Sequence, residues 1–288
     1  MTGQSGLEGK DNVALPYRGV FGVMRPYEVD QLALPPRPMP SHQRLRPLKS
    51  WRYVGVYGPE LMLCLGAVRI GPARQCFWAL WDRRRRALHE RTRLGRRGVE
   101  LSPGRARIAD GSIEVDLALA ETSGIETVCA SGDSYAWTRK QGGVLVSGTV
   151  VIDGRRQPLQ GRAVLDDTAG YYERHTRWYW SAGVGTAVDG RAVAWNLVDG
   201  VNDPPARSER TVWIDGEPIE APPSRFSADL TRVDRLEFTP EATRERHENL
   251  LLIRSAYRQP FGTFSGELPG GVKLAEGYGV MESHDVRW

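Results

Sequence analysis

Short runs of apolar or alternating residues follow one another from Trp51 to the C-terminus, punctuated by Gly, Pro or Asp-Gly. An apolar residue at every second position is typical of a strand with one buried face. Many short strands joined by tight turns predict an antiparallel all-β barrel or sandwich with few short helices. The clearest runs are WRYVGVYG, LMLCLGAVRIG, QCFWALWD, GSIEVDLALAET and GIETVCASG.

Three Asp-Gly pairs stand between such runs and predict two-residue hairpin turns. Both central positions of a type I′ turn need a positive φ, which Asp-Gly adopts readily. The pairs are Asp153-Gly154, Asp189-Gly190 and Asp215-Gly216.

Three segments depart from the β pattern. Residues 1–14 are polar and contain several Gly, so we expect them to be disordered. Leu32–Pro47 is rich in Pro, which forbids a regular helix or a central strand, and we interpret it as an extended segment on the surface. A proline-rich ligand for a partner is the alternative interpretation. Thr239–Leu251 is the best helix candidate, and a turn followed by a strand is its alternative.

The faces of the central hairpin follow from its predicted turn. Counting outward from Asp189-Gly190 places Gly183 opposite Asn196. One face is then apolar and holds Trp178, Trp180, Ala182, Val184, Val193, Trp195 and Leu197. The other face holds His175, Arg177, Tyr179, Ser181 and Asn196. That second face is either simply solvated, or its glycines make room for a ligand close to the backbone.

Length and charge narrow the class of protein. The 288 residues suffice for one large β domain or two ordinary ones, and 40% are hydrophobic, including nine Trp and ten Tyr. A net charge of +4, from 39 basic and 35 acidic residues, is too balanced to indicate a nucleic-acid partner. The basic run Trp81–Gly98 contains no interleaved aromatic residues. It indicates a solvated strand end and loop, or a surface for phosphates or acidic headgroups.

Cysteine usage gives no sign of a metal site or a disulfide framework. Cys64, Cys76 and Cys129 are widely spaced, and the chain has no CxxC or HExxH motif. We therefore expect small buried thiols and no bound metal. The sequence also has no signal-peptide pattern, no apolar stretch of membrane-spanning length, no phosphate-binding loop and no GxSxG. A cytoplasmic protein without a cofactor is the resulting expectation.

The terminal stretch GYGVMESHDVRW places two ionisable residues on an apolar strand face. Glu282 and His284 share that face with Tyr278, Val286 and other apolar residues. Burial of either group is unfavourable unless it is paired, and a neighbouring carboxylate would raise the imidazole pKa. The pair is interpreted either as a general acid or base or as a structural brace.

Three further acidic residues are weighed in the same way. Asp166 and Asp167 are adjacent, so on a strand they point to opposite faces and cannot form a dyad in one pocket. Asp167 has the parity of His175 and could face a cavity, or it could form a turn. Glu209 has the parity of Trp213, and is either a pocket acid or an exposed or Arg-paired residue.

Several blocks in a fixed order resemble an uncharacterised bacterial family, the domain of unknown function family 2804. The blocks are DDTAGYYERHTRWYWSAGVG, DGRAVAWNLVDGVND, SERTVWIDG, QPFGTFSGELPGGVKL and GYGVMESHDVRW. The resemblance runs from about Pro16 to the end and is densest after Leu165. The family in turn resembles tandem lipocalin-like (calycin) proteins that include carotenoid 1,2-hydratases and some cyclases.

That resemblance implies two β-barrel-like domains side by side, with pockets for apolar molecules. We place them at residues 15–160 and 161–288. The hydratases carry an Asp-His-x-Trp-Gly block, and the nearest stretch here is Arg174–Trp178. His175 and Trp178 match that block, but its Asp and Gly are replaced, so the reaction does not transfer directly.

The resulting hypothesis is an apolar small molecule in a β enclosure, with acid–base chemistry of the hydratase, isomerase or cyclase type. The candidate catalytic residues are Glu282, His284, His175 and Asp167. The candidate ligand-binding residues are Trp178, Trp180, Tyr179, Arg177, Trp195, Asn196, Glu209, Trp213 and Tyr278. A non-catalytic carrier or sensor of a lipid-like ligand is one alternative. A structural or interaction protein, using the Pro-rich segment and the basic run, is the other.

Overall fold

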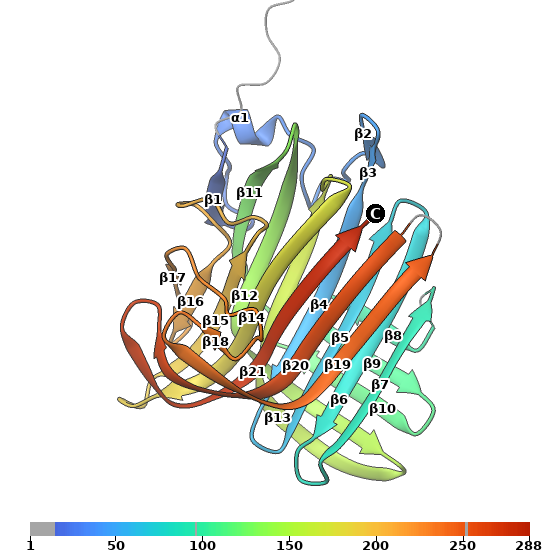
Figure 1. Cartoon of the computed structure of the whole chain (residues 1–288), viewed down its shortest axis with the longest axis vertical. Coiled ribbons are helices and arrows are strands. Elements are labelled where there is room, and N and C mark those ends of the chain that lie inside the picture. The colour runs from blue at the N-terminus through green and yellow to red at the C-terminus, as the bar shows by residue number, and fades with distance from the viewer. Residues whose placement is uncertain (1–14, 96, 251–252) are drawn as a thin grey trace, which may run out of the picture.

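Two large antiparallel sheets, each curled into half of a barrel, pack against each other (Figure 1). The computed structural model describes residues 15–95, 97–250 and 253–288. The N-terminal segment 1–14, predicted to be disordered, lies outside these residues. Within them, the helix α1 (Tyr27–Asp30) makes only a single turn. No helix in these ranges is long and apolar enough to cross a membrane. The predicted all-β antiparallel class, with two lipocalin-like halves side by side, is confirmed.

The first sheet is built from the N-terminal part of the chain, in the order β7-β6-β5-β4-β13-β12-β10-β9-β8. A side branch from β12 adds β11 and then β1. The strands are β1 (Tyr17–Val20), β4 (Lys49–Tyr57), β5 (Leu61–Ile70), β6 (Ala73–Asp82), β7 (Ala87–Leu94), β8 (Val99–Ser102), β9 (Arg105–Asp110), β10 (Ile113–Leu119), β11 (Ile125–Ser131), β12 (Ser134–Ile152) and β13 (Arg155–Gly170).

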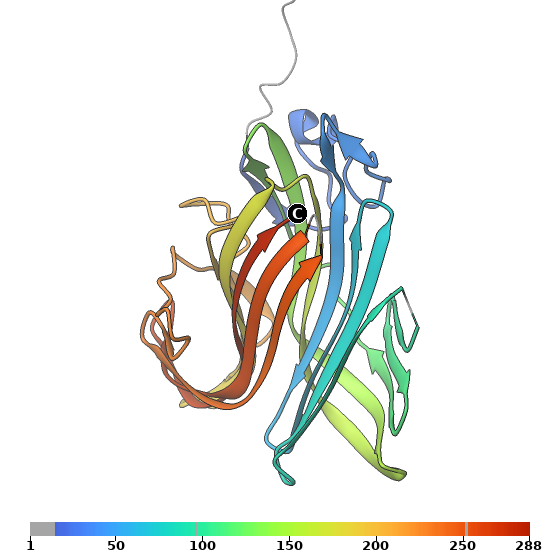
Figure 2. The same cartoon turned by 45° about the vertical axis from the view of Figure 1, so that its right-hand side comes forward.

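The second sheet has the order β17-β16-β15-β14-β21-β20-β19-β18, so the C-terminal strand β21 lies at its centre. Its strands are β14 (His175–Ala187), β15 (Ala192–Asp199), β16 (Thr211–Ile214), β17 (Glu217–Glu220), β18 (Arg232–Val233), β19 (Leu236–Leu250), β20 (Ile253–Leu268) and β21 (Val272–Arg287). In Figure 2, strands β19 to β21 lie alongside β4 to β6 of the first sheet.

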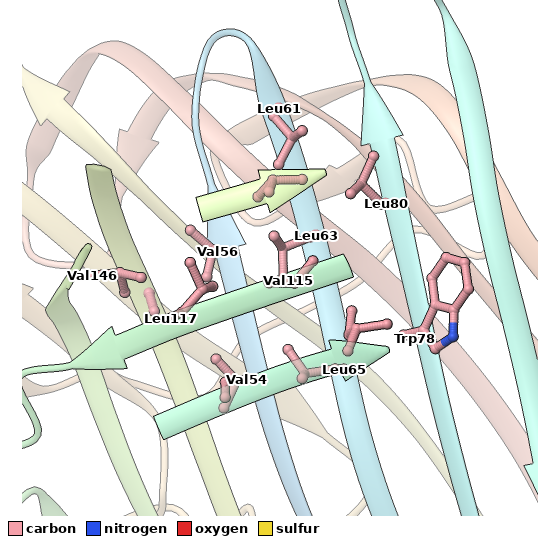
Figure 3. Packing of buried hydrophobic residues seen from close by; sticks show 14 of the residues in the cluster. Val54, Val56, Leu61, Leu63, Leu65, Trp78, Leu80, Val115, Leu117 and Val146 are labelled. Carbon is pink, nitrogen blue, oxygen red and sulfur yellow. The ribbon is translucent and has the colours of Figure 1, made fainter. Parts of the chain in front are cut away.

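Strands β4 and β5 are apolar on both faces because alternate residues pack into two different cores. Val54 and Leu63 point into a core enclosed by the curl of the first sheet, where they meet Val115 of β10 (Figure 3). Tyr53 and Met62, one position away in each strand, point into a second core between the two sheets. A strand that is buried on both sides loses the polar half of its alternation. The second sheet encloses a further core of its own.

The chain changes from one sheet to the other between Gly170 and His175. The predicted domain boundary, between residues 160 and 161, falls inside β13. Strand β13 pairs with β12 along its whole length and with β4 from Arg162 onward. Residues 160 and 161 are therefore part of a long β hairpin of the first sheet.

The Pro-rich segment 32–47 runs over the end of the first sheet beside β11 and β12. Leu34 is buried there among Val128, Tyr135 and Trp137. The segment ends in a two-stranded sheet formed by β2 (His42–Gln43) and β3 (Arg46–Pro47).

Two local predictions are wrong. Residues 239–250 form part of β19 instead of a helix, because they pair with β20 along their length and this tertiary context overrides the helix propensity of Glu and Arg. Asp189-Gly190 does not form a two-residue turn. Thr186 pairs with Ala192, so the connection is one residue longer and the register of β15 shifts by one. The other two Asp-Gly pairs form the predicted turns, with positive φ at both residues.

The described part of the basic run begins at the end of β6 and continues through a turn and β7, and several of its cations have carboxylate partners. Arg83 pairs with Glu241, while Arg91 and Arg93 both pair with Asp110. These contacts favour the interpretation as a solvated strand end and loop over a phosphate-binding surface.

Candidate functional site

A cavity of about 210 Å³ lies between the two sheets and is lined by both. Most of its wall is apolar and aromatic. The rings include Trp51, Tyr53 and Phe77 from the first sheet, and Trp178, Trp180 and Tyr257 from the second. Trp51 stacks on Trp178, and Tyr53 meets Trp180 edge-on, so the aromatic residues also hold the sheets together.

The polar groups of the second sheet enter the cavity in cross-strand rows. Residues paired across antiparallel strands share a face, so each row delivers its side chains to one place. One row joins Trp180, Glu282, Gln259 and Arg244 across strands β14, β21, β20 and β19. The next row joins Trp178, His284, Tyr257 and Arg246 across the same strands. Seven of these eight side chains line the cavity. The eighth, Gln259, is hydrogen-bonded to Glu282.

Glu282 is 8% exposed and accepts three hydrogen bonds. Its Oε1 accepts one from Trp178 Nε1 at 2.9 Å. Its Oε2 accepts from the Tyr257 hydroxyl at 3.0 Å and from Gln259 Nε2 at 2.9 Å. Burial raises the pKa of Glu282 to about 6, against the opposing effect of the Trp178 and Tyr257 hydrogen bonds and of the Arg244 charge. The carboxyl group therefore changes charge close to neutral pH.

His284 is held as a neutral imidazole. Its Nε2 lies 2.7 Å from Ser255 Oγ, and its ring packs 4.4 Å from that of Trp178. Burial, followed by the positive charge of Arg244, lowers the pKa of His284 to about 3. The expectation that Glu282 would raise this pKa is wrong, because the carboxylate bonds to other donors and desolvation dominates.

A buried ion cluster forms another part of the wall. Lys140 Nζ lies 2.6 Å from Asp166 and 3.2 Å from Glu209. Trp51 Nε1 donates to Asp166, and Asn202 donates to Glu209. Burial alone would lower the pKa of Lys140, but the two neighbouring carboxylates outweigh burial and raise it. Burial raises the pKa of Glu209. The cluster keeps Lys140 charged inside the protein.

Five predicted residues meet at this cavity, namely Glu282, His284, Trp178, Trp180 and Glu209. His175 does not join them, because it lies on the other face of β14, half exposed, with its Nε2 2.8 Å from Asp285. Asp167 also points away, to Arg52 at 2.8 Å. Strand β13 runs straight through this position, so alternation sends Asp166 into the cavity in place of Asp167.

The shifted register of β15 corrects the predicted faces of the central hairpin. Trp195 pairs with Gly183 and lies in the core of the second sheet, not on the face of Trp180. Asn196 faces Trp180 instead, accepts a hydrogen bond from its Nε1 at 2.8 Å and donates to the Glu209 carbonyl. A shift of one residue moves every side chain of a strand to the opposite face.

The remaining predicted residues lie outside the cavity. Arg177 donates to the hydroxyl of Tyr179 on the opposite face of β14. Trp213 packs between the sheets against Gly142, and Tyr278 lies under Arg83. Within the described ranges, no group of three His, Cys, Asp or Glu residues is arranged to hold a metal ion.

Sequence reasoning missed Arg244, Tyr257, Gln259 and Lys140, and it favoured Asp167 over Asp166 as the carboxylate that faces the cavity. The helical interpretation of Thr239–Leu251 hid the alternation that places Arg244 and Arg246 on one face. Lys140 carried no local signal, since its partners come from β13 and from the segment before β16.

Comparisons with known proteins place the fold. The family model described as a domain of unknown function (DUF2804) matches residues 95–288. A crystal structure of a protein assigned as AttH from Nitrosomonas europaea has a TM-score of 0.53 and 18% identity, over 91% of this chain and 97% of that one. Kievitone hydratase from Nectria haematococca has a TM-score of 0.49 and 12% identity, over 82% of this chain and 88% of that one. No curated protein matches the sequence significantly.

Proposed function

This chain belongs to the DUF2804 family, and we propose that it binds an apolar small molecule between its sheets and moves a proton with Glu282. The observation that carries this proposal is a buried carboxyl group, with a pKa of about 6, in the wall of an aromatic cavity. An acid–base group works best when its pKa lies near the working pH.

The hydrogen bonds of Glu282 suit proton transfer. Among the described residues, Trp178 is the single hydrogen-bond donor to Oε1, so a lone pair remains for a substrate proton. Tyr257 and Gln259 hold Oε2 and fix the carboxyl plane. The neutral imidazole of His284, beside it, orients a substrate through hydrogen bonds and does not take up a proton near pH 7.

This chemistry needs no cofactor and fits three reaction classes. Protonation of an alkene followed by attack of water is hydration. Removal of a proton from one carbon and its return to another is isomerisation. Protonation followed by attack of an internal double bond or oxygen is cyclisation. The rings of the wall supply the apolar surroundings that such substrates require.

Deuterium labelling tests the proposal across a range of candidate substrates. A panel of apolar alkenes, enones and cyclic ketones is incubated with the protein in D2O, and products are followed by mass spectrometry. Exchange or isomerisation adds one mass unit per deuterium, and hydration adds D2O. We expect Glu282→Gln to reduce the rate by about 10² or more, since removing general acid–base transfer has effects of that size.

Ligand binding distinguishes an enzyme from a carrier. Quenching of tryptophan fluorescence reports binding, because Trp178 and Trp180 line the cavity. Glu276→Gln, the same change at an exposed position of β21, is the matched control and should leave labelling intact. Binding that occurs without any labelling in the wild-type protein would favour a carrier. Labelling that survives Glu282→Gln would refute the assigned role.

A further inference from the structure

Arg244 places a buried cation in the cavity wall, close to Glu282. Its side chain is 4% exposed and lies between two rings, 4.4 Å from Phe77 of the first sheet and 4.9 Å from Tyr257 of the second. The N–H donors of a guanidinium lie in its plane, so contacts of its central carbon with the rings do not use them.

The donors of Arg244 are not fully used. Its Nη2 donates to Thr92 Oγ1 at 2.9 Å. Its Nε makes no hydrogen bond to any described residue, although Glu90 Oε2 lies 3.4 Å away. Buried guanidinium groups normally satisfy their donors, because an unpaired donor in a dry site is unfavourable. Nε itself is buried beside Glu90, so the donors open to a ligand are the remaining N–H groups of the fork, of which only one at Nη2 has an acceptor among the described residues. The guanidinium lines the cavity, so these donors are available there.

Arg244 and Glu282 face the same space with one residue between them. Arg244 pairs with Gln259 across β19 and β20, and Gln259 donates to Glu282 across β20 and β21. Two strand spacings separate their backbones by roughly 10 Å. Both side chains extend from these strands into the one cavity, and the charge of Arg244 acts on the Glu282 carboxyl group, so a single small molecule can contact both.

We propose that Arg244 binds the oxygen of an enolisable carbonyl group, so that the substrate class is apolar ketones and enones. This inference rests on the proposed role of Glu282 and adds a partner for the developing negative charge. A guanidinium in a water-poor cavity stabilises an oxyanion more than a neutral carbonyl, which lowers the barrier for proton removal.

The step balances without a further reactant. The carboxylate of Glu282 takes a proton from the carbon next to the carbonyl group. The electron pair of that C–H bond becomes the new C=C bond, and the C=O π pair moves to the oxygen beside Arg244. Return of the proton to the same carbon gives exchange, and its return to the far carbon of a conjugated system gives isomerisation.

Two probe sets separate this inference from the proposed function. Binding of naphthalene measures apolar binding, and the additional affinity of 2-naphthoate measures recognition of its anionic oxygens. Exchange of the hydrogens next to the carbonyl of 2-tetralone in D2O measures enolisation. We expect 2-naphthoate to bind wild-type protein more tightly than naphthalene. Arg244→Met should weaken 2-naphthoate binding roughly 10- to 100-fold, the range for a hydrogen bond to a charged group, and leave naphthalene binding within about twofold.

The same variant should slow 2-tetralone exchange by roughly 10²-fold, the effect of losing an oxyanion donor. Arg244→Lys keeps the charge without the planar fork and should give intermediate binding. Arg254→Met, an exposed arginine on β20, is the matched control. Near-ultraviolet circular dichroism checks the fold of each variant. If Arg244→Met does not fold, Arg244→Lys supplies the test.

Each outcome has one meaning. Equal binding of both naphthalene probes by the wild-type protein, or unchanged 2-naphthoate binding in the folded Arg244 variants, overturns the role of Arg244 and leaves the proposed function standing. Failure of wild-type protein to bind naphthalene overturns the proposed function, and this inference falls with it.

Discussion

At the scale of single residues, burial drives Glu282 and His284 in the same chemical direction. Each group is pushed toward its neutral form, so the pKa of the acid rises and that of the base falls. His284 then stays uncharged across the physiological range, and Glu282 becomes the group that titrates there. Proton transfer in this cavity therefore rests on the carboxyl group.

The raised pKa of Glu282 predicts a specific pH dependence of stability. The folded protein binds this proton more tightly than the unfolded chain, whose ordinary value is 4.5. The stabilisation is fully present below pH 4.5 and is lost as the pH rises through 6, by about 2 kcal/mol at ~1.4 kcal/mol per pKa unit. In urea unfolding, Glu282→Gln should gain about 1.5 kcal/mol of stability relative to wild type when the pH is raised from 4.5 to 6.5. A difference that does not change with pH would contradict the prediction.

His284 predicts the opposite trend over an overlapping range. Its folded pKa of about 3 lies below the ordinary value of 6.5, so the unfolded chain binds the proton more tightly. Stability from this group is present above pH 6.5 and is lost as the pH falls toward 3. His284→Asn should show a shallower acid loss in urea unfolding than wild type does. His42→Asn, at an exposed position, should keep the wild-type slope.

At the scale of elements, the register between β14 and β15 decides what the glycines do. Gly183 lies opposite Trp195, whose indole ring covers the space that a side chain would need. The ring donates to Ser181 Oγ at 3.1 Å and packs against Phe264. The glycine therefore serves packing inside the second sheet and does not make room for a ligand.

Gly183→Ala should destabilise the protein by about 1–3 kcal/mol, the usual range for overpacking a core. The added Cβ would collide with the Trp195 ring. Gly161→Ala is the matched control, since its Cβ would lie 3.7 Å from Val56, an ordinary contact. Thermal unfolding of both variants measures the difference. Equal melting temperatures would contradict the observed register.

At the scale of the whole molecule, the two sheets are joined by ionic as well as apolar contacts. Lys140 of the first sheet reaches Glu209, in the segment that leads into β16 of the second. Arg83 of the turn after β6 pairs with Glu241 of β19. These two ion pairs link the sheets on either side of the cavity and help to hold them together.

Lys140→Met should destabilise the folded protein by about 3–5 kcal/mol, because it leaves Asp166 and Glu209 as uncompensated buried charges. Adding Glu209→Gln should recover part of that loss, since it removes one of the stranded charges. Lys273→Met, at an exposed position, serves as the control. The measurement is the free energy of unfolding in urea, and additive effects of Lys140→Met and Glu209→Gln would refute the coupling.

The sequence by itself determined the class of fold and part of the site. Period-two alternation and turn residues identify strands because they reflect local geometry, which holds for the Asp153-Gly154 and Asp215-Gly216 hairpins. The same alternation puts Glu282 and His284 on one face, and both enter the cavity. Trp178 and Trp180 follow from parity along a single strand.

Only the tertiary structure decided which partners these residues meet. The loop after β14 is one residue longer than its Asp-Gly pair indicates. Trp195 and Asn196 therefore each lie on the face opposite to the one predicted. Arg244, Lys140 and Asp166 come from strands that are distant in the chain and are adjacent only across the sheets. Register and sheet packing are set by long-range contacts, which local patterns do not encode.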